Sequence, residues 1–298
     1  MTASVFGPDR ICAVIAAPTS AEAVRQLRSA MGLRGRLRVL ELRLDYLRDA
    51  AERAALLRWV SRHLARQKSH RASYQLAHHH PETSAHRASP PARMPTILAA
   101  CRTRRGGGQF DGSIEEEIAI LAQAAQAGCL WCDVEIETAE RLVPAELHAA
   151  LAPARVLISA HDFRLLPPRL SALREKLFRC GGDAVKVAAA CRSLADTRRL
   201  LALVGQRDNV IAIPMADKSA AEDAAAPRIL ALREGAALAY AAVDRTTAPG
   251  QLSLDAIKRV YHLNRVFAKN ATANHVAANH VATTHFTTKH FTTKTVAK

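Results

Sequence analysis

Eight short apolar runs alternate along the chain with longer segments in which apolar residues recur at helical spacing. The runs lie at 11–16, 37–43, 96–101, 131–136, 155–160, 184–189, 209–214 and 238–242. The helix-like segments lie at 20–31, 48–66, 114–127, 138–151, 167–179, 192–205, 221–233 and 253–263. Buried strands that alternate with helices are typical of a parallel sheet covered by helices. Eight such pairs in 298 residues predict an α/β protein with the architecture of a (β/α)8 TIM barrel.

A doubly wound open sheet is the alternative, but Pro18-Thr19-Ser20 stands where a dinucleotide-binding fold has its glycines. We therefore expect a single barrel domain over 1–268. Within it, residues 67–94 have little apolar pattern and predict a disordered insertion between the second helix and the third strand. Residues 269–298 repeat histidine every five positions among Thr, Ala and Lys, which predicts a disordered low-complexity tail.

Composition narrows the class of protein. Apolar residues make up 49% of the chain, yet no stretch approaches the ~20 apolar residues that a membrane span needs. The first ten residues lack the pattern of a signal peptide, so a cytoplasmic location is expected by default. Cys129 and Cys132 have CxxC spacing, but no second such pair or His pair lies nearby. We interpret all six cysteines as reduced residues, mostly in strands and helices, and expect no metal site.

The net charge of +15 raises the question of nucleic-acid binding. Residues 62–94 hold six Lys or Arg and one acid, and residues 269–298 hold four lysines and no acid. Much of the excess therefore lies in segments expected to be disordered, and aromatic residues do not interleave with the cations. This distribution argues against a folded nucleic-acid-binding face.

Lys186 is a lone cation in the apolar run 184–189, which follows the glycine pair Gly181-Gly182. A buried strand seldom tolerates an unpaired ammonium, because burial favours the neutral amine and lowers the pKa of lysine. A neutral amine attacks ketones to form Schiff bases. The alternative is a lysine at a strand end that reaches water or pairs with a carboxylate.

Further polar residues follow the strands, where a barrel carries its active site. Glu41, Arg43 and Asp45 alternate with leucines, so we expect them to point into the mouth, although an internal salt-bridge network is also open. Arg102 precedes a run of three glycines, 106–108, at the end of the third strand. His161 ends the fifth strand, next to the strand of Lys186, and is a candidate proton shuttle. The remaining candidates for the mouth are Arg228, Thr247 and Gln251.

In these stretches the chain resembles the type I 3-dehydroquinate dehydratases. The matching stretches are ELRLD (41–45), the Arg102 turn with its glycines, DVEIE (133–137), ISAHDF (158–163), GGDAVKVA (181–188) and TTAPGQLS (246–253). They occur in the order found in that family and cover roughly 10–265. Each motif is weak alone, whereas the set is specific.

The resemblance implies dehydration of 3-dehydroquinate to 3-dehydroshikimate through a Schiff base on Lys186, with His161 as general acid and base. It also implies that Glu41, Arg43, Arg102, Arg228, Thr247 and Gln251 hold the hydroxyls and carboxylate of this small-molecule substrate. Neither a metal nor an organic cofactor is implied, and the family suggests a homodimer.

Three departures bear on activity. The family usually has a glutamate that orients the histidine at the position of Gly106, and a glycine at the position of Ala216. The loop from Met215 to Arg228 is also longer than in the family, which makes the alignment of Arg228 insecure. Other readings stay open: a different Schiff-base barrel such as an aldolase, a weakened barrel that binds a metabolite, or a basic protein whose tails bind polyanions.

Overall fold

All eight predicted strands are present, each within two residues of its expected bounds. They all run parallel in one sheet. In the computed structural model they are β1 (Ile11–Ile15), β2 (Val39–Arg43), β3 (Thr96–Ala100), β4 (Trp131–Glu135), β5 (Arg155–Asp162), β6 (Ala184–Ala190), β7 (Val210–Met215) and β8 (Ala239–Ala242). The structure describes residues 5–6, 10–32, 39–77, 95–204, 209–215, 225–244, 246–248, 250–257 and 259.

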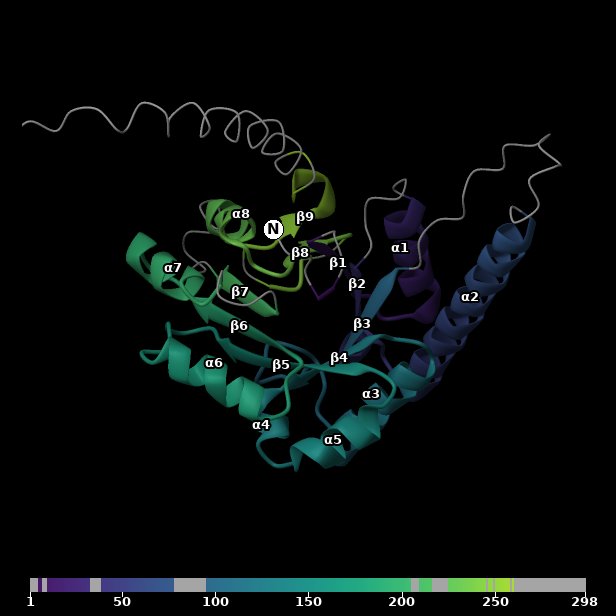
Figure 1. Cartoon of the computed structure of the whole chain (residues 1–298), viewed down its shortest axis with the longest axis horizontal. Helices are drawn as coiled ribbons and strands as arrows, with labels where there is room; N and C mark the ends of the chain where they lie inside the picture. The colour runs from purple at the N-terminus through teal and green to yellow at the C-terminus, as the bar shows by residue number, and fades with distance from the viewer. Residues whose placement is uncertain are drawn as a thin grey trace, which may run out of the picture. The chain divides into compact units, whose positions relative to one another are not determined.

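The strands are hydrogen-bonded in chain order from β1 to β7, and β8 pairs with β1. A short additional strand, β9 (Leu252–Ser253), pairs with β8 and was not predicted. At the other edge, the backbone N–H of Ala237 donates to the carbonyl oxygen of Val210 at 3.0 Å, which links the chain before β8 to β7. The sheet is curled, with the helices on its outer side (Figure 1). The predicted (β/α)8 architecture is confirmed.

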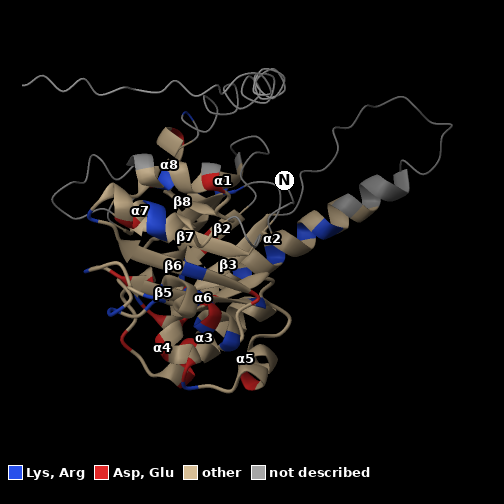
Figure 2. Cartoon of the chain, turned by 60° about the vertical axis from the view of Figure 1, so that its left-hand side comes forward, with Lys and Arg blue, Asp and Glu red and all other residues tan. Residues whose placement is uncertain are grey.

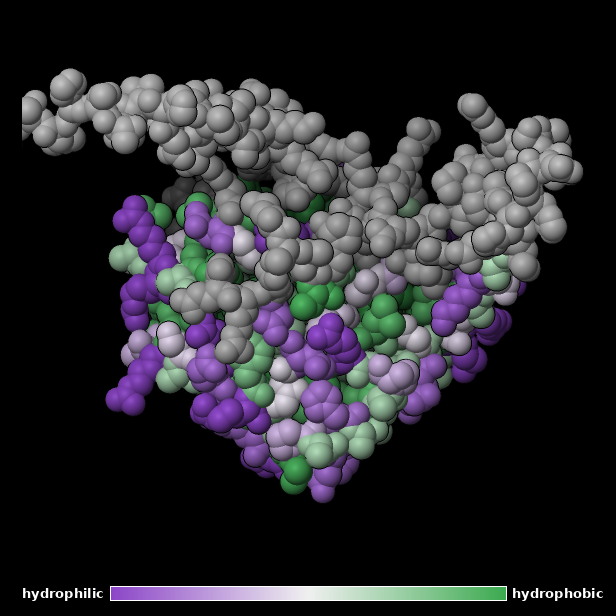
Figure 3. Space-filling model, viewed as in Figure 1, coloured by the Kyte–Doolittle hydropathy of each residue, from purple (hydrophilic) through white to green (hydrophobic). Residues whose placement is uncertain are grey.

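The helices that cover the sheet mostly follow the predicted segments. They are α1 (Ser20–Gly32), α2 (Ala50–Ala77), α3 (Ile114–Gln126), α4 (Ile136–Ala139), α5 (Pro144–Leu151), α6 (Leu170–Arg179), α7 (Leu194–Leu201) and α8 (Ala225–Glu234), with a 3-10 turn η1 at Leu44–Tyr46. The outer surfaces of α2, α6 and α7 are mostly hydrophilic (Figure 3).

Two helix predictions need correction. The segment 138–151 is split into α4 and α5, because Pro144 begins a new helix and holds the preceding Val143 in an extended conformation. The segment 67–94 is not wholly an irregular insertion, since α2 continues to Ala77. No Gly or Pro interrupts residues 67–77, so nothing in that stretch stops the helix. Residues 78–94 lie outside the described residues.

The chain divides into a unit at Met1–Ile257 and a second at Lys258–Lys298. The helix expected at 253–263 begins at Leu254, but it is described only in part, and the histidine-rich tail lies outside the described residues. In the described part, Lys and Arg mark the length of α2, whereas acidic residues lie around α3, α4 and α5 (Figure 2). No helix among the described residues is both long and apolar enough to cross a membrane.

The apolar core fills the end of the barrel at which the strands begin. Trp131 and Val39, the first residues of β4 and β2, are buried there with Leu98 of β3. Phe6, which precedes β1, packs on Trp131 with ring centroids 4.4 Å apart. Burying one such side chain stabilises the fold by roughly 1.5–3 kcal/mol. The apolar plug leaves the opposite end of the barrel for polar side chains.

Candidate active site

Lys186 lies in the middle of β6 and is 2% exposed. Successive side chains of a strand point to opposite faces, so Val185 and Val187 face the helices while Lys186 faces the interior. Its Nζ donates to Oδ2 of Asp133 on β4, lies 3.8 Å from Oε1 of Glu41 and sits 4.9 Å from the ring centre of Tyr240. The lysine is therefore both buried and paired with a carboxylate. It does not reach bulk water.

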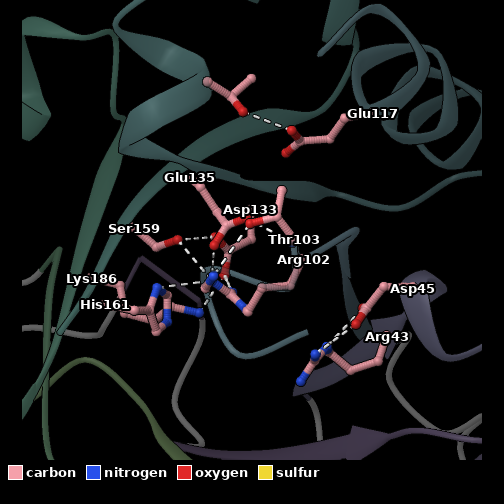
Figure 4. A network of polar contacts seen from close by, with 12 residues as sticks. Arg43, Asp45, Arg102, Thr103, Glu117, Asp133, Glu135, Ser159, His161 and Lys186 are labelled. Atoms are coloured by element: carbon pink, nitrogen blue, oxygen red, sulfur yellow. Dashed lines mark hydrogen bonds and ion pairs between the residues drawn. The ribbon is translucent and has the colours of Figure 1, made fainter. Parts of the chain in front are cut away.

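Burial, and secondarily the charge of Arg102, lower the pKa of Lys186, while Asp133 and Glu41 oppose the change. The net direction is downward, which enlarges the neutral fraction of the amine. Asp133 is shared: its Oδ2 also accepts from Nη2 of Arg102 at 2.7 Å (Figure 4). Although burial alone raises the pKa of Asp133, Arg102 and Lys186 hold it well below its usual range. Asp133 is an anion between two cations.

His161 is the second-last residue of β5 and lies on the same face of the sheet as Lys186. Its Nδ1 lies 2.9 Å from Nη1 of Arg102. The same Nη1 of Arg102 also donates to Oγ of Ser159 at 3.3 Å. Burial first, and then the charges of Arg102 and Lys186, lower the pKa of His161 well below its ordinary value. The imidazole is therefore neutral at physiological pH, which is the state needed to accept a proton.

The end of β2 carries both arrangements expected from the sequence, an internal salt bridge and a side chain that points into the mouth. Arg43 donates through Nε and Nη2 to the two carboxylate oxygens of Asp45, at 2.9 and 2.7 Å, and both side chains are buried. Asp45 turns away into η1 and accepts from the backbone N–H of Gln109 at 3.1 Å. Glu41 instead lies beside Lys186, and its buried Oε1 accepts no hydrogen bond from the described residues. The internal ion pair thus coexists with a carboxylate that faces the mouth.

The last polar residues come from α8 and from the segment after β8. Arg228 of α8 is buried, which lowers its pKa to about 10 and leaves it charged at neutral pH. Oε1 of Gln251 accepts from the backbone N–H of Thr247 at 2.7 Å and from its Oγ1 at 3.1 Å. Ala216 and the segment 216–224 lie outside the described residues.

All eight predicted site residues line one cavity of about 480 Å³ that opens to solvent. The cavity is lined by Glu41, Arg43, Arg102, His161, Lys186, Arg228, Thr247 and Gln251, together with Gly106, Gly107, Phe163, Met215 and Tyr240.

Three buried polar groups of this network were not predicted as site residues: Asp133, Glu135 and Ser159. The carboxylates Asp133 and Glu135 alternate with apolar residues in β4, and this charge within an apolar strand was the available signal. Among the described residues, no group of three or more His, Cys, Asp or Glu is arranged to hold a metal ion. Cys129 and Cys132 are free and buried, and burial raises the pKa of the Cys132 thiol to about 12.

A family model and the curated relatives identify one family. The family described as type I 3-dehydroquinase matches residues 11–267. A 3-dehydroquinate dehydratase of Methanobrevibacter smithii is 30% identical over 170 residues, which is 56% of this chain and 71% of that protein. One from Methanothermobacter thermautotrophicus is 30% identical over 55% of this chain and 71% of its own length.

The fold agrees with solved structures. The 3-dehydroquinate dehydratase of Geobacillus kaustophilus superposes with a TM-score of 0.63 at 21% identity, covering 87% of this chain and 92% of that one. The type I enzyme of Clostridium difficile gives a TM-score of 0.62 at 19% identity, covering 88% and 93%. The predicted family and enzyme class are thereby confirmed. The chain belongs to the type I 3-dehydroquinase family.

Proposed function

We propose that this enzyme dehydrates 3-dehydroquinate to 3-dehydroshikimate through an imine formed on Lys186, with His161 as the general acid and base. The family and the names of its relatives support the overall dehydration. The observation that carries the finer proposal is a buried lysine with a lowered pKa, in a cavity that His161 also lines.

In the first stage, neutral Lys186 adds through Nζ to the C3 carbonyl of the substrate and forms a carbinolamine. Loss of water gives a protonated imine, which withdraws electrons from the neighbouring carbon C2. Before this step the ammonium of Lys186 must lose a proton. The lowered pKa of Lys186 reduces the cost of that loss.

In the second stage, His161 removes the C2 proton, and the electron pair moves toward the imine nitrogen. The C1 hydroxyl then leaves as water after it takes a proton from the imidazolium, and a carbon–carbon double bond forms between C1 and C2. Hydrolysis of the imine returns the amine of Lys186. The sum is the loss of one water from the substrate, and neither a metal nor an organic cofactor enters these steps.

The other residues of the cavity supply binding. The side chain of Glu41 accepts a hydrogen bond from a substrate hydroxyl, which gives its buried Oε1 a donor. Arg43, Arg102, Arg228, Thr247 and Gln251 hold the remaining hydroxyls and the carboxylate. Each charge-assisted hydrogen bond contributes ~1.5–3 kcal/mol.

Two measurements test the proposal. Substrate should give a product that absorbs in the ultraviolet as a conjugated enone, whereas an aldolase would cleave a carbon–carbon bond and give no such product. Borohydride added with substrate should leave ligand mass on the peptide that contains Lys186. Lys186→Met should lose both signals, while Lys176→Met, at an exposed lysine of α6, should keep both.

An unmodified Lys186 peptide in an active preparation would refute the imine. Ligand binding without enone formation would favour the weakened barrel instead. Homodimerisation is a further proposal, and the molar mass in solution decides it against the 32.3 kDa of one chain.

A further inference from the structure

A side chain at Gly106 would require Glu135 to move. A Cβ atom built on it would lie 1.5 Å from Oε1 of Glu135 and 3.2 Å from Cγ of Arg102. The obstacle at Gly106 is therefore a carboxylate that comes from the end of β4, across the mouth of the barrel. The space in which a residue at 106 would place its side chain is already filled by Glu135.

Glu135 is held in this position from two sides. Its Oε2 accepts from the backbone N–H of Thr103 at 2.8 Å, and its Oε1 lies 3.6 Å from Nη1 of Arg102. The side chain is buried, so its charge acts in a medium with little water. Glu135 thus binds both the backbone directly after Arg102 and the Arg102 guanidinium itself.

The Arg102 guanidinium connects this carboxylate to His161. Its Nη2 is bound by Asp133, which leaves Nη1 between Glu135 and Nδ1 of His161 (Figure 4). A negative charge beside Nη1 favours the guanidinium orientation that reaches the imidazole. Without that charge, the carboxylate of Asp133 and the hydroxyl of Ser159 would remain as restraints on Arg102.

We propose that Glu135 is a positioning residue, whose carboxylate holds Arg102 and through it His161, and that position 106 is glycine because this carboxylate occupies its side-chain space. The inference rests on the proposed dehydratase function. A carboxylate from β4 therefore lies beside Gly106, between the loop after β3 and Arg102.

A double-mutant cycle tests the spatial part of the proposal. Gly106→Ala should lower kcat about 10–100-fold, as losses of supporting contacts around a site commonly do, because the new methyl group displaces Glu135. In a Glu135→Ala background the same change should cost less than about threefold, since the carboxylate is gone. The backbone of Gly106 is not in the left-handed region, so alanine itself brings no backbone strain.

The charge is tested with Glu135→Gln, which keeps an oxygen for the N–H of Thr103. Burial raises the pKa of Glu135, whereas Arg102 and the hydrogen bonds from Thr103 oppose this change. The neighbouring carboxylates are Asp133 and Glu117. The ratio of wild-type to variant kcat should be about 10–100 in alkaline solution. It should fall toward one as the pH drops, because protonated Glu135 resembles glutamine. A purely structural role for Glu135 would leave this ratio constant.

Glu137→Gln serves as the control, since Glu137 is an exposed carboxylate two residues further along the chain. Circular dichroism and Tm show whether each variant folds, and the Glu135→Gln series can be read on its own if Glu135→Ala is poorly stable. Additive losses in the cycle, or a ratio independent of pH in an active wild type, would overturn the role of Glu135 while leaving the dehydratase function intact. A wild type that forms no enone would instead defeat both proposals.

Discussion

Nδ1 of His161 lies 2.9 Å from Nη1 of Arg102, within hydrogen-bonding distance. A guanidinium has only donors, so the imidazole nitrogen must accept this bond. Neutral His161 therefore carries its proton on Nε2 in the free enzyme. Arg102 thus sets the position of the ring in the free enzyme, and substrate groups that bind Arg102 would release Nδ1 so that it can accept a proton.

This relationship predicts an unusual histidine in nuclear magnetic resonance spectra. In the free enzyme, the 15N shifts of His161 should show the Nε2–H tautomer. The imidazole should not become protonated near pH 6.5, because burial and the cations Arg102 and Lys186 lower its pKa. His161→Ala identifies the signals by their loss. An Nδ1–H tautomer, or a titration at the ordinary pKa of histidine, would contradict the hydrogen bond with Arg102.

Asp133→Asn should lower the stability strongly. The change removes the anion that Arg102 and Lys186 share and leaves two buried cations side by side. Breaking a buried pair in this way costs about 3–5 kcal/mol of the free energy of unfolding. Denaturant titration at pH 7 measures the loss, and Asp111→Asn, at an exposed partner of Arg104, is the control with little expected change.

The pH dependence of the Asp133 effect has a definite sign. The pKa of Asp133 is depressed in the folded state, so its contribution is present above the unfolded pKa of about 3.8 and is lost as the pH falls below it. The difference between wild type and Asp133→Asn should therefore shrink in acid. An equal difference at pH 3 and pH 7 would show that the charge of Asp133 is not what stabilises the fold.

The placement of the strands and of the eight site residues could be predicted from the sequence, because both depend on local pattern and chain order. Apolar runs locate the strands, and parallel strands bring their carboxyl ends to one mouth. Lys186 interrupts one apolar run, and His161 stands at the end of another. Their meeting in one cavity follows once the barrel is assumed.

The partners of these residues could not be predicted in the same way. Asp133 bridges β3 and β6 through Arg102 and Lys186, which depends on how far the sheet curls. Likewise, Gly106 alone suggested a lost carboxylate, whereas the structure places Glu135 in that space. Whether a carboxylate of another strand reaches this space depends on side-chain geometry at the mouth, about which hydrophobic periodicity carries no information.

Phe6→Ala should destabilise the barrel without changing the chemistry. Phe6 is buried against Trp131 at the end opposite the cavity, so the loss is one of packing. Truncation of a buried phenylalanine costs about 3–5 kcal/mol, and the Tm should fall accordingly. Below the new transition, kcat and KM should match those of the wild type. A fall in kcat in fully folded protein would show that the plug affects the mouth.

Because Glu117 of α3 is buried, we expect its contribution to the free energy of unfolding to decrease from acid toward neutral pH. The side chain is buried, and its Oε2 accepts from Oγ1 of Thr138 at 2.7 Å. Its Oε1 has no hydrogen-bond partner among the described residues. Burial raises the pKa of Glu117 from 4.5 to about 7, despite the bond from Thr138. The folded protein therefore retains a proton that the unfolded chain releases between these two values.

A group whose pKa is raised by folding gives its stabilisation below the unfolded pKa and loses it as the pH rises through the folded one. Between about pH 4.5 and pH 7, this carboxyl should reduce the free energy of unfolding by on the order of 3 kcal/mol. Glu117→Gln keeps an acceptor for Thr138 but cannot ionise, so its stability relative to wild type should improve over that interval. Chemical denaturation of both proteins at pH 5 and pH 8 measures the change. A relative stability that is the same at both pH values would mean that Glu117 ionises as readily in the fold as in water.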